Sequence, residues 1–352
     1  MAEPRFPVIG ATRGEMRGFV ASLGEAGYRA DQVLEWVYVH GAESFQAMTN
    51  LSKCLRAKLE ACAVLFTSAA QEVQMSLDGT EKRLIELADG EAVETVTIPA
   101  GDRRTVCLST QVGCPVGCAF CASGLGGLVR SLTAGEIVEQ ALHARRCFEP
   151  PEVSMNLVVM GIGEPLANFD AVVRALTIFT ASWGLAMSGR RITVSTVGRP
   201  RRMRQLAETG LGVNLAVSLH APDDATRRRL VPGARPVGQV VKAARDYLEA
   251  TGREVTVEYV LVQDVNDSPA AAKALADVLG DLDVLVNLIP LNPVPGLPWR
   301  EPSLARVDAF ADELRRRGVR AEVRRQRGAD IEAACGQLRR RGEDADGAGR
   351  GR

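Results

Sequence analysis

Residues 105–121 read TVCLSTQVGCPVGCAFC, an apolar β-type run followed by three cysteines within eight residues. Cysteine thiolates are the usual protein ligands of iron–sulfur clusters, and three of them leave one iron of a four-iron cluster open to another ligand. Zinc is the alternative metal, but zinc needs four ligands, and the next histidine, His143, falls in a later helical pattern. The spacing of Cys114, Cys118 and Cys121 therefore favours an iron–sulfur cluster over a zinc site or inert buried thiols.

Five further apolar, β-rich runs follow, and helical patterns such as TAGEIVEQALHARR and PAAAKALADVLG separate the runs. The six runs occupy residues 105–113, 153–161, 191–197, 212–219, 254–262 and 283–290. Strands that alternate with helices predict a parallel sheet with right-handed crossovers. Because six units are present where a closed barrel has eight, we predict an α/β fold built on a partial (β/α)6 TIM-like barrel.

The first hundred residues follow other patterns. Residues 12–62 place apolar side chains at helical spacing, and residues 64–100 contain Asp-Gly twice between alternating segments, which indicates a β-hairpin. We expect five parts along the chain. They are an N-terminal helical accessory domain (1–63), a β-hairpin connector (64–104), the partial barrel (105–300), a C-terminal segment (301–338) and a disordered tail (339–352).

Composition excludes several classes of protein. The chain has 352 residues, 46% of them apolar and 24% charged, and its formal net charge is zero, which excludes disorder over the whole length. It contains no stretch of 18 apolar residues and no secretory leader, so we expect a cytoplasmic protein that neither spans a membrane nor forms a disulfide framework.

Charge is nevertheless unevenly distributed along the chain, because residues 186–235 hold ten arginines against three acidic residues. Such a stretch is typical of phosphate contacts, although a solvated helix face would look the same.

The C-x3-C-x2-C spacing resembles the signature of the radical S-adenosylmethionine superfamily. Further motifs narrow this resemblance to the RlmN/Cfr family of RNA adenine methyltransferases, over about residues 28–338. The motifs are QVGCPVGCAFC, MGIGEPL, ITVSTVG, AVSLHAPDD, NLIPLNPVPG and DIEAACGQL. The resemblance implies an N-terminal helical accessory domain that binds RNA, and a partial (β/α)6 barrel.

The resemblance also implies two cofactors and the residues that hold them. A [4Fe–4S] cluster would bind Cys114, Cys118 and Cys121, and S-adenosylmethionine would occupy the open iron. The contacts to S-adenosylmethionine are expected at the ends of the predicted strands, where barrel chemistry collects. These contacts are Gly163, Glu164, Ser195, Ser218, Leu219, His220 and Asn292.

Three further residues acquire roles from the resemblance. Cys335 lies at the family's methyl-carrying position, Cys107 at that of its resolving cysteine, and Glu94 at that of its proton acceptor. Read without the family, Cys335 would be a small buried hydrophobe, Cys107 a strand residue and Glu94 a solvated hairpin carboxylate.

Carbon 2 of adenine is electron-poor and cannot attack a sulfonium methyl group, so a radical must be delivered to it. The reaction that the resemblance implies uses two molecules of S-adenosylmethionine for this. The first methylates Cys335 by displacement. The second is cleaved by an electron from the cluster, and the resulting radical takes hydrogen from that methyl group. The methylene radical adds to the base, the ring proton is removed, and Cys107 attacks the sulfur of Cys335 to form a disulfide and release the RNA.

The implied substrates are an adenine of 23S rRNA and adenosine 37 of some tRNAs. The implied partners are an electron donor of flavodoxin or ferredoxin type and a thiol reductant, and DNA is not expected to be one. Methylation of carbon 8 of the same rRNA adenine, which gives antibiotic resistance, is the nearest alternative. A paralogue acting on another adenine-containing substrate and a non-catalytic iron–sulfur RNA-binding protein are the others.

Overall fold

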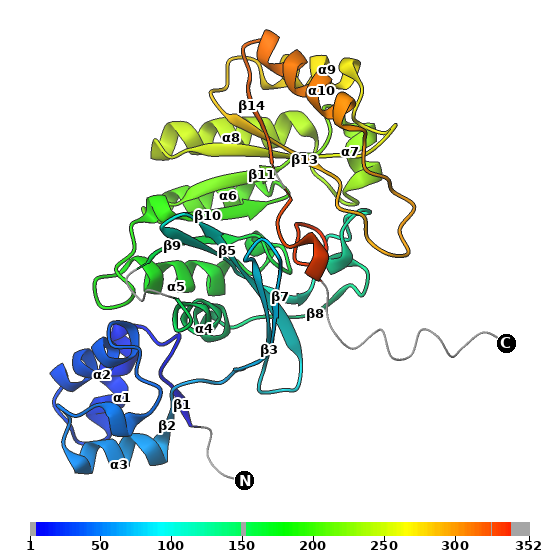
Figure 1. Cartoon of the computed structure of the whole chain (residues 1–352). Coiled ribbons are helices and arrows are strands. Elements are labelled where there is room, and N and C mark those ends of the chain that lie inside the picture. Colours follow the sequence, from blue (N-terminus) through cyan, green and yellow to red (C-terminus); the bar gives the residue numbers. More distant parts are fainter. Residues whose placement is uncertain (1–4, 149–152, 325, 339–352) are drawn as a thin grey trace.

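A ten-stranded sheet runs through the protein in the computed structural model, which describes residues 5–148, 153–324 and 326–338 (Figure 1). The predicted tail, residues 339–352, lies outside the described residues. Seven neighbouring strands of this sheet are parallel. They are β6 (Arg103–Cys107), β9 (Ser154–Val159), β10 (Ile192–Thr196), β11 (Asn214–Ser218), β12 (Val255–Leu261), β13 (Leu285–Pro290) and β14 (Arg320–Val323). The predicted partial barrel is confirmed, and β14 extends it beyond the six strands expected.

Helices cross over between the parallel strands, as the alternating pattern predicts. They are α4 (Ala134–Arg145), α5 (Phe169–Thr180), α6 (Pro200–Glu208), α7 (Asp224–Leu230), α8 (Val237–Thr251), α9 (Pro269–Leu279) and α10 (Leu304–Arg316), and short 3-10 turns at Pro165–Ala167 and Gly189–Arg191 join the rest. The strand residues Val194, Val217 and Val257 belong to the main hydrophobic core. Because neighbouring side chains on a strand point to opposite faces, Ser195 and Ser218 point away from that core.

The hairpin connector is a three-stranded antiparallel meander that continues the main sheet. It consists of β3 (Ala69–Met75), β4 (Glu81–Glu86) and β5 (Ala92–Ala100), and β5 pairs with β6. The two Asp-Gly pairs lie at its two turns, where Gly79 and Gly90 have φ of +80° and +84°. Glycine adopts this left-handed backbone without steric cost, which is why the dipeptide indicated the turns.

The first predicted strand, residues 105–113, is wrong as a single element. β6 ends at Cys107, and a separate strand, β7 (Gln111–Gly113), pairs with β8 (Leu128–Ser131) in its own two-stranded sheet. The break follows from Gln140 of α4, whose side chain accepts from the backbone N–H of Ser109 at 2.8 Å and donates to its carbonyl at 3.0 Å. A side chain therefore takes the hydrogen bonds that the next strand would have made.

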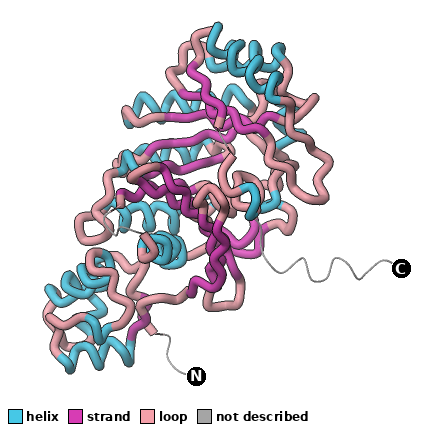
Figure 2. The backbone as a smooth tube through the Cα atoms, in the orientation of Figure 1, coloured by secondary structure: helices cyan, strands magenta, loops and turns pink. Residues whose placement is uncertain are grey.

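A separate helical unit precedes the meander, seen at the lower left of Figure 2. It contains α1 (Arg13–Ser22), α2 (Tyr28–Tyr38), a 3-10 turn (Phe45–Ala47) and α3 (Lys53–Cys62), with the short parallel pair β1 (Phe6–Pro7) and β2 (Ala63–Val64). Two arginines of the barrel helices join it to the barrel, since Arg145 donates to the carbonyl of Tyr38 at 2.7 Å and Arg174 to that of Gly10 at 2.6 Å. Among the described residues, no helix is both long enough and apolar enough to cross a membrane.

Candidate active site

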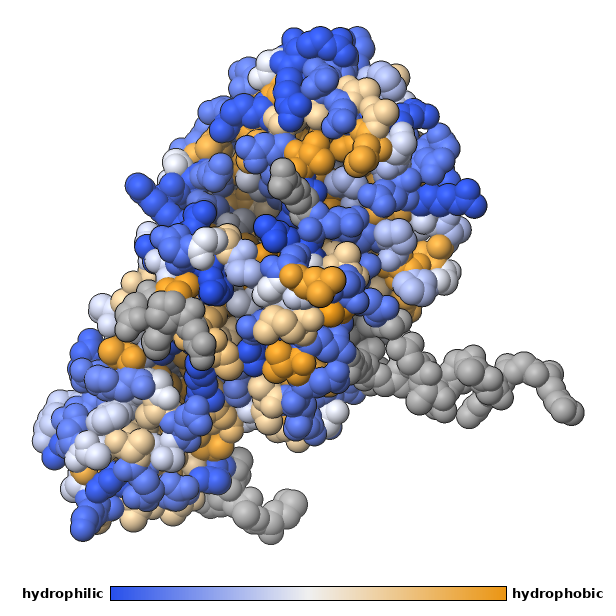
Figure 3. Space-filling view, in the orientation of Figure 1, coloured by the Kyte–Doolittle hydropathy of each residue, from blue (hydrophilic) through white to orange (hydrophobic). Residues whose placement is uncertain are grey.

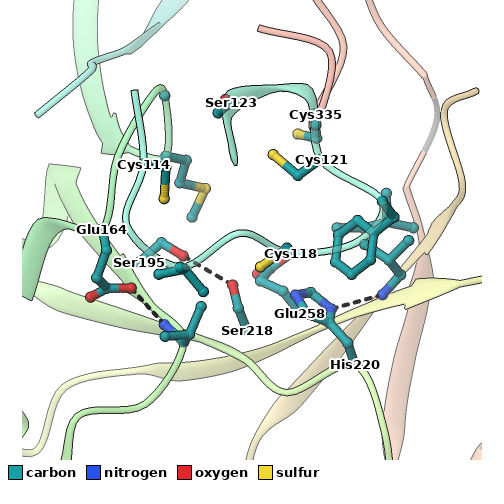
Figure 4. Close-up of a pocket in the computed structure, with 18 of the residues that line it drawn as sticks. Cys114, Cys118, Cys121, Ser123, Glu164, Ser195, Ser218, His220, Glu258 and Cys335 are labelled. Carbon is teal, nitrogen blue, oxygen red and sulfur yellow. Dashed lines mark hydrogen bonds between the residues drawn. The ribbon is translucent and has the colours of Figure 1, made fainter. Parts of the chain in front are cut away.

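One cavity collects residues from the carboxyl ends of the parallel strands, the cysteine loop and the C-terminal segment (Figure 4). The cysteine loop, residues 114–121, follows β7, and a 3-10 turn (Ala122–Gly124) closes it. Cys114, Cys118 and Cys121 line the cavity together with Cys335, and Figure 4 shows their sulfur atoms around the same space. The sheet ends thus bring together cysteines that the sequence places in two distant segments.

Backbone contacts hold the cysteine loop in shape. Gly113 has φ of +75°, and a Cβ at this position would lie 1.9 Å from the carbonyl oxygen of Gly127. Only glycine therefore fits at the end of β7, where the chain entering the cysteine loop meets the residue that precedes β8. Farther along, the backbone N–H of Ala119 donates to the carbonyl of Leu230 at 2.8 Å, and the indole of Trp299 donates to the carbonyl of Ala119 at 2.7 Å. Segments far apart in the sequence therefore fix the loop on both sides.

The donor set of the loop fits an iron–sulfur cluster. Burial raises the pKa of Cys114 to about 11 and also raises the pKa of Cys118 and Cys121, and the three thiols repel one another's negative charge. Bound iron would supply the positive charge that lets three buried sulfurs ionise together. No group of three or more His, Cys, Asp or Glu side chains in the described ranges is arranged to hold a single metal ion. A four-iron cluster would differ from a single ion because each thiolate would bind a different iron, so the three sulfurs need not converge on one point.

The Gly-Ile-Gly-Glu-Pro motif lies at the end of β9, beside the cysteines. Gly163 has φ of +111°, and a Cβ there would lie 2.8 Å from Thr110 Oγ1 and 2.8 Å from Gln111 Cβ, so a side chain would collide with the start of β7 and the residue before it. The carboxylate of Glu164 lines the cavity and is 3% exposed. It accepts from Thr196 Oγ1 at 2.7 Å and from the backbone N–H of Val197 at 2.9 Å. Burial raises its pKa, so a cation in the cavity would stabilise its charged form.

The predicted cofactor contacts of the next strands form a polar strip on the cavity wall. Ser195 Oγ lies 3.3 Å from Ser218 Oγ. His220 has φ of +60°, and its Nδ1 accepts the backbone N–H of Val260 at 3.1 Å. Burial, with the charge of Arg227, lowers the pKa of His220 to about 3, so the ring is neutral near pH 7. His220 therefore lines the cavity without acting as an acid. The side chain of Leu219 points into the main core, so only its backbone can contribute.

Cys335 reaches the cavity through the C-terminal segment, just after the 3-10 turn Ala329–Ile331. Asn292 donates to the carbonyl of Cys335 at 2.8 Å, and the backbone N–H of Ala122 donates to the carbonyl of Gly336 at 2.8 Å. The segment that carries Cys335 is thus hydrogen-bonded directly to the loop that carries Cys121.

Cys107 lies at the end of β6, in a small apolar cluster that also contains Val96 and Ala333. Burial, and to a smaller extent the charge of Cys335, raise its pKa to about 12, and Arg324 opposes both effects. All eight cysteines, including this pair, are free thiols. Cys107 thus packs against the segment that carries Cys335, through Ala333, and the Arg324 guanidinium acts on its charge.

Glu94 is not among the residues that line the cysteine cavity. It is 3% exposed on β5, where its Oε1 lies 3.3 Å from Lys82 Nζ. Lys82 also donates to the carbonyl of Glu332 at 3.4 Å, so the ion pair touches the segment that leads to Cys335. The sequence suggested a solvated hairpin carboxylate as the alternative, and burial excludes that alternative.

Three charged residues of the site were missed by the sequence analysis. Glu258 and Arg324 line the cavity, and the Arg227 guanidinium, 1% exposed, donates to the carbonyls that end β10 and β11. The sequence could have indicated Glu258, because it is the one charged residue in the β-rich run VTVEYVLV. The sequence could not have indicated Arg227, because nothing distinguishes it from its two neighbours in the run RRR at 227–229.

The family comparisons agree with this geometry. Residues 7–65 match the ribosomal RNA large subunit methyltransferase N-terminal domain, and residues 108–275 match the radical SAM superfamily. A probable dual-specificity RNA methyltransferase RlmN 3 of Opitutus terrae is 46% identical, with 95% of this chain and 94% of that protein covered. A probable RlmN of Rhodopirellula baltica is also 46% identical, over 94% of this chain and 90% of that protein.

Among solved structures, a radical SAM methyltransferase from Sphaerobacter thermophilus matches with a TM-score of 0.92 and 46% identity, covering 96% of this chain and 99% of that one. This match spans the helical unit, the meander and the barrel. The radical SAM superfamily implies a [4Fe–4S] cluster and S-adenosylmethionine as cofactors. The chain belongs to the RlmN family of radical S-adenosylmethionine methyltransferases.

Proposed function

We propose that this enzyme methylates carbon 2 of a specific adenine in 23S rRNA, and of adenosine 37 in some tRNAs, with Cys335 as the methyl carrier. The observation that carries the proposal is the position of Cys335, which lines the same cavity as the three cluster cysteines. The names of the relatives support the class of substrate, since they are dual-specificity RNA methyltransferases.

The cofactors supply one-electron chemistry and the transferable methyl group when they are bound. Cys114, Cys118 and Cys121 hold the cluster, and Glu164 takes the ammonium group of S-adenosylmethionine, because a buried carboxylate needs a cation. Ser195, Ser218 and Asn292 supply further polar contacts, and Gly163 keeps the approach open. Two molecules of S-adenosylmethionine are used in each turnover, one to methylate Cys335 and one to activate that methyl group.

Cys107 resolves the covalent RNA adduct in this proposal. Its thiolate attacks Cys335 Sγ, and the bond from that sulfur to the RNA-bound carbon breaks with its electron pair going to the carbon. That carbon takes up a proton to become the methyl group, and a disulfide between the two cysteines remains. The packing of Cys107 against Ala333, two residues before Cys335, supports this pairing, and the guanidinium of Arg324 favours the ionised form of the attacking sulfur. An external thiol reductant then returns both sulfurs to thiols, and an electron donor of flavodoxin or ferredoxin type serves the cluster.

Glu94 accepts the ring proton in this proposal. Its neighbour Lys82 touches both the carboxylate and the segment of Cys335, so the carboxylate lies at the edge of the space where the base would be held. The base must turn its carbon toward that edge, and the ion pair must loosen when the proton arrives.

The RNA backbone contacts an arginine-rich groove beside the cysteine cavity. The groove lies around the start of α6 and is lined by Arg199, Arg201, Arg202 and Arg235, and Val116 and Val197 line both hollows. None of the ten arginines between residues 190 and 235 makes an ion pair within 4 Å with a described carboxylate, whereas thirteen arginines elsewhere in the described chain do. Unneutralised guanidinium groups in a groove fit phosphates. The face shown in Figure 3 is mostly hydrophilic, with smaller hydrophobic patches.

Mass analysis of RNA from a strain that lacks the gene tests the proposal. We expect loss of 2-methyladenosine from 23S rRNA and tRNA, and recovery when the native gene is returned but not when it carries Cys335→Ala. Loss of 8-methyladenosine instead would assign the enzyme to carbon 8, and unchanged RNA would refute the proposal. As a check on the cofactor, Cys118→Ala should abolish both the iron content and the thiolate-to-iron absorption of the reconstituted protein.

A further inference from the structure

Glu258 is a charged residue in the middle of an apolar strand. It lies on β12, is 5% exposed and lines the cysteine cavity, where Figure 4 shows it beside Ser218 and His220. A buried carboxylate is costly unless its oxygens accept hydrogen bonds. Its place in the cavity therefore needs an explanation that strand packing does not give.

Only one of the two oxygens of Glu258 has partners among the described residues. Oε1 accepts from Asn287 Nδ2 at 2.9 Å and from Thr256 Oγ1 at 3.0 Å. These two bonds fix the direction of the carboxylate, while Oε2 is buried and has no hydrogen-bond partner in the part of the chain that is described. Arg324 lines the same cavity and interacts with the charge of Glu258, but the two form no ion pair within 4 Å among the described residues. Oε2 is thus oriented and left available for a donor.

The surroundings of Glu258 divide into a polar and an apolar part. Ser218 faces Glu258 on the neighbouring strand, and Ser218 in turn approaches Ser195, so three strands present a row of hydroxyl and carboxylate groups. Two residues farther along β12, Val260 begins an apolar part. That part consists of Phe120, Val260, Ile289 and Leu291, which line the cavity and belong to one apolar cluster.

We propose that Glu258 Oε2 accepts a hydrogen bond from a ribose hydroxyl of S-adenosylmethionine. The apolar part of the cavity fits the flat adenine ring, and the sugar attached to that ring then lies at the level of the polar row. A carboxylate is an acceptor only, so it needs a donor and repels the carboxylate of the methionyl group. This inference rests on the proposed function, in which the methionyl ammonium is bound by Glu164, on the far side of Ser195 and Ser218. The ribose hydroxyls are the donors that remain beside the base.

The test measures binding of S-adenosylhomocysteine, which does not react, to the anaerobically reconstituted protein by calorimetry. Wild-type protein, Glu258→Gln and Glu322→Gln are compared with S-adenosylhomocysteine and with its 2′-deoxy and 3′-deoxy analogues. Glu322 is an exposed carboxylate on β14, so its variant controls for loss of a charge from the same sheet. Removing a hydrogen bond to a charged group should weaken binding roughly tenfold to a hundredfold.

We expect Glu258→Gln to weaken binding of S-adenosylhomocysteine by this factor, and one of the deoxy analogues to bind wild-type protein equally weakly. That analogue should lose little further affinity in Glu258→Gln, because the bond is already gone, and Glu322→Gln should behave as wild type in every arm. If the loss of affinity from Glu258→Gln and the loss from each deoxy analogue multiply when the two changes are combined, they are independent and the proposal is overturned. Glu258 would then face another group of the ligand, such as the ammonium.

If Glu258→Gln does not fold, the analogues decide the question in wild-type protein. Equal affinity for S-adenosylhomocysteine and both deoxy analogues there would refute a ribose contact. The measurement involves no RNA, so its failure leaves the proposed RNA methylation untouched, and failure of the RNA assay leaves this contact untouched.

Discussion

Replacing Arg227 by methionine should destabilise the protein by about 3 kcal/mol and loosen the cofactor cavity. Arg227 comes from α7, and its guanidinium donates to four backbone carbonyls, those of Val197 at 2.5 Å, Arg235 at 2.5 Å, Leu219 at 2.9 Å and Ser218 at 3.1 Å. The carbonyls of Val197, Ser218 and Leu219 lie at the ends of β10 and β11, and that of Arg235 lies just before α8, so a single side chain ties together the ends of both strands and this later segment.

The magnitude follows from two opposing effects. Leaving a buried acceptor unpaired costs roughly 1–3 kcal/mol, so four of them would cost at least about 4 kcal/mol. Burying a guanidinium without a carboxylate partner is itself unfavourable, and the methionine relieves that cost, which the lowered pKa of Arg227 reflects. Water that enters from the cavity offsets a further part. A net loss of about 2–4 kcal/mol remains, which places this substitution among the severe ones.

Urea denaturation of Arg227→Met, Arg227→Lys and Arg228→Met provides the assay. Arg228 is exposed on the same helix, so its replacement should change the free energy of unfolding by less than about 0.5 kcal/mol. Lysine retains the charge but cannot reach four carbonyls, so Arg227→Lys should lie between the other two. A free energy of unfolding for Arg227→Met within 0.5 kcal/mol of wild type would refute the reasoning, because the four hydrogen bonds would then contribute nothing net.

The remaining predictions concern the sulfur chemistry, the RNA groove and acid stability. Cys107→Ala should accumulate protein covalently joined to RNA, seen as a nuclease-sensitive shift on a denaturing gel, and the Cys107→Ala, Cys335→Ala double variant should show none. Charge reversal at Arg201 together with Arg202, both in the groove, should weaken RNA binding in anisotropy titrations and reduce its salt dependence, and equal affinities at low and high salt would contradict this. His220 has a folded-state pKa of about 3, below its unfolded value, so the protein should lose roughly 1.4 kcal/mol per pH unit below about 6.5 on its account, and His220→Asn should flatten that slope in acid titrations.

Periodic features of the chain were predictable from sequence. The apolar runs of β9 to β13 recur between amphipathic helices, and period alone distinguishes the two element types. The cysteine spacing is equally local, since all three thiols lie within eight residues. The break between β6 and β7 was not predictable, because it depends on Gln140, a residue of a later helix that captures the backbone of Ser109.

The site residues also divide into those that local sequence pattern predicts and those that depend on contacts between distant segments. Ser195 and Ser218 could be predicted because the ends of parallel strands meet at one edge of a sheet. The ion pair of Glu94 with Lys82 could not, because it depends on the register of β4 against β5, in which Glu94 faces Leu84 rather than Lys82. Arg227 could not be separated from its two neighbours either, since burial is a property of the folded helix and not of the residue type.

The C-terminal segment joins the meander to the region of the cysteine loop and so helps to build the cavity. The segment is bonded to the cysteine loop through Ser123 Oγ, which donates to the carbonyl of Leu338 at 2.6 Å, and to the turn of the meander through Ser76 Oγ, which donates to Asp330 at 2.5 Å. Cys335 lies between these two attachments and is itself exposed. Ser123, Leu338 and Ser76 are all buried, so water competes little for these two hydrogen bonds, and Ala333 and Leu338 add apolar contacts to the cluster around Cys107. In the proposed reaction Cys335 meets first the cofactor and then Cys107, and buried attachments on either side would keep its sulfur between these two partners.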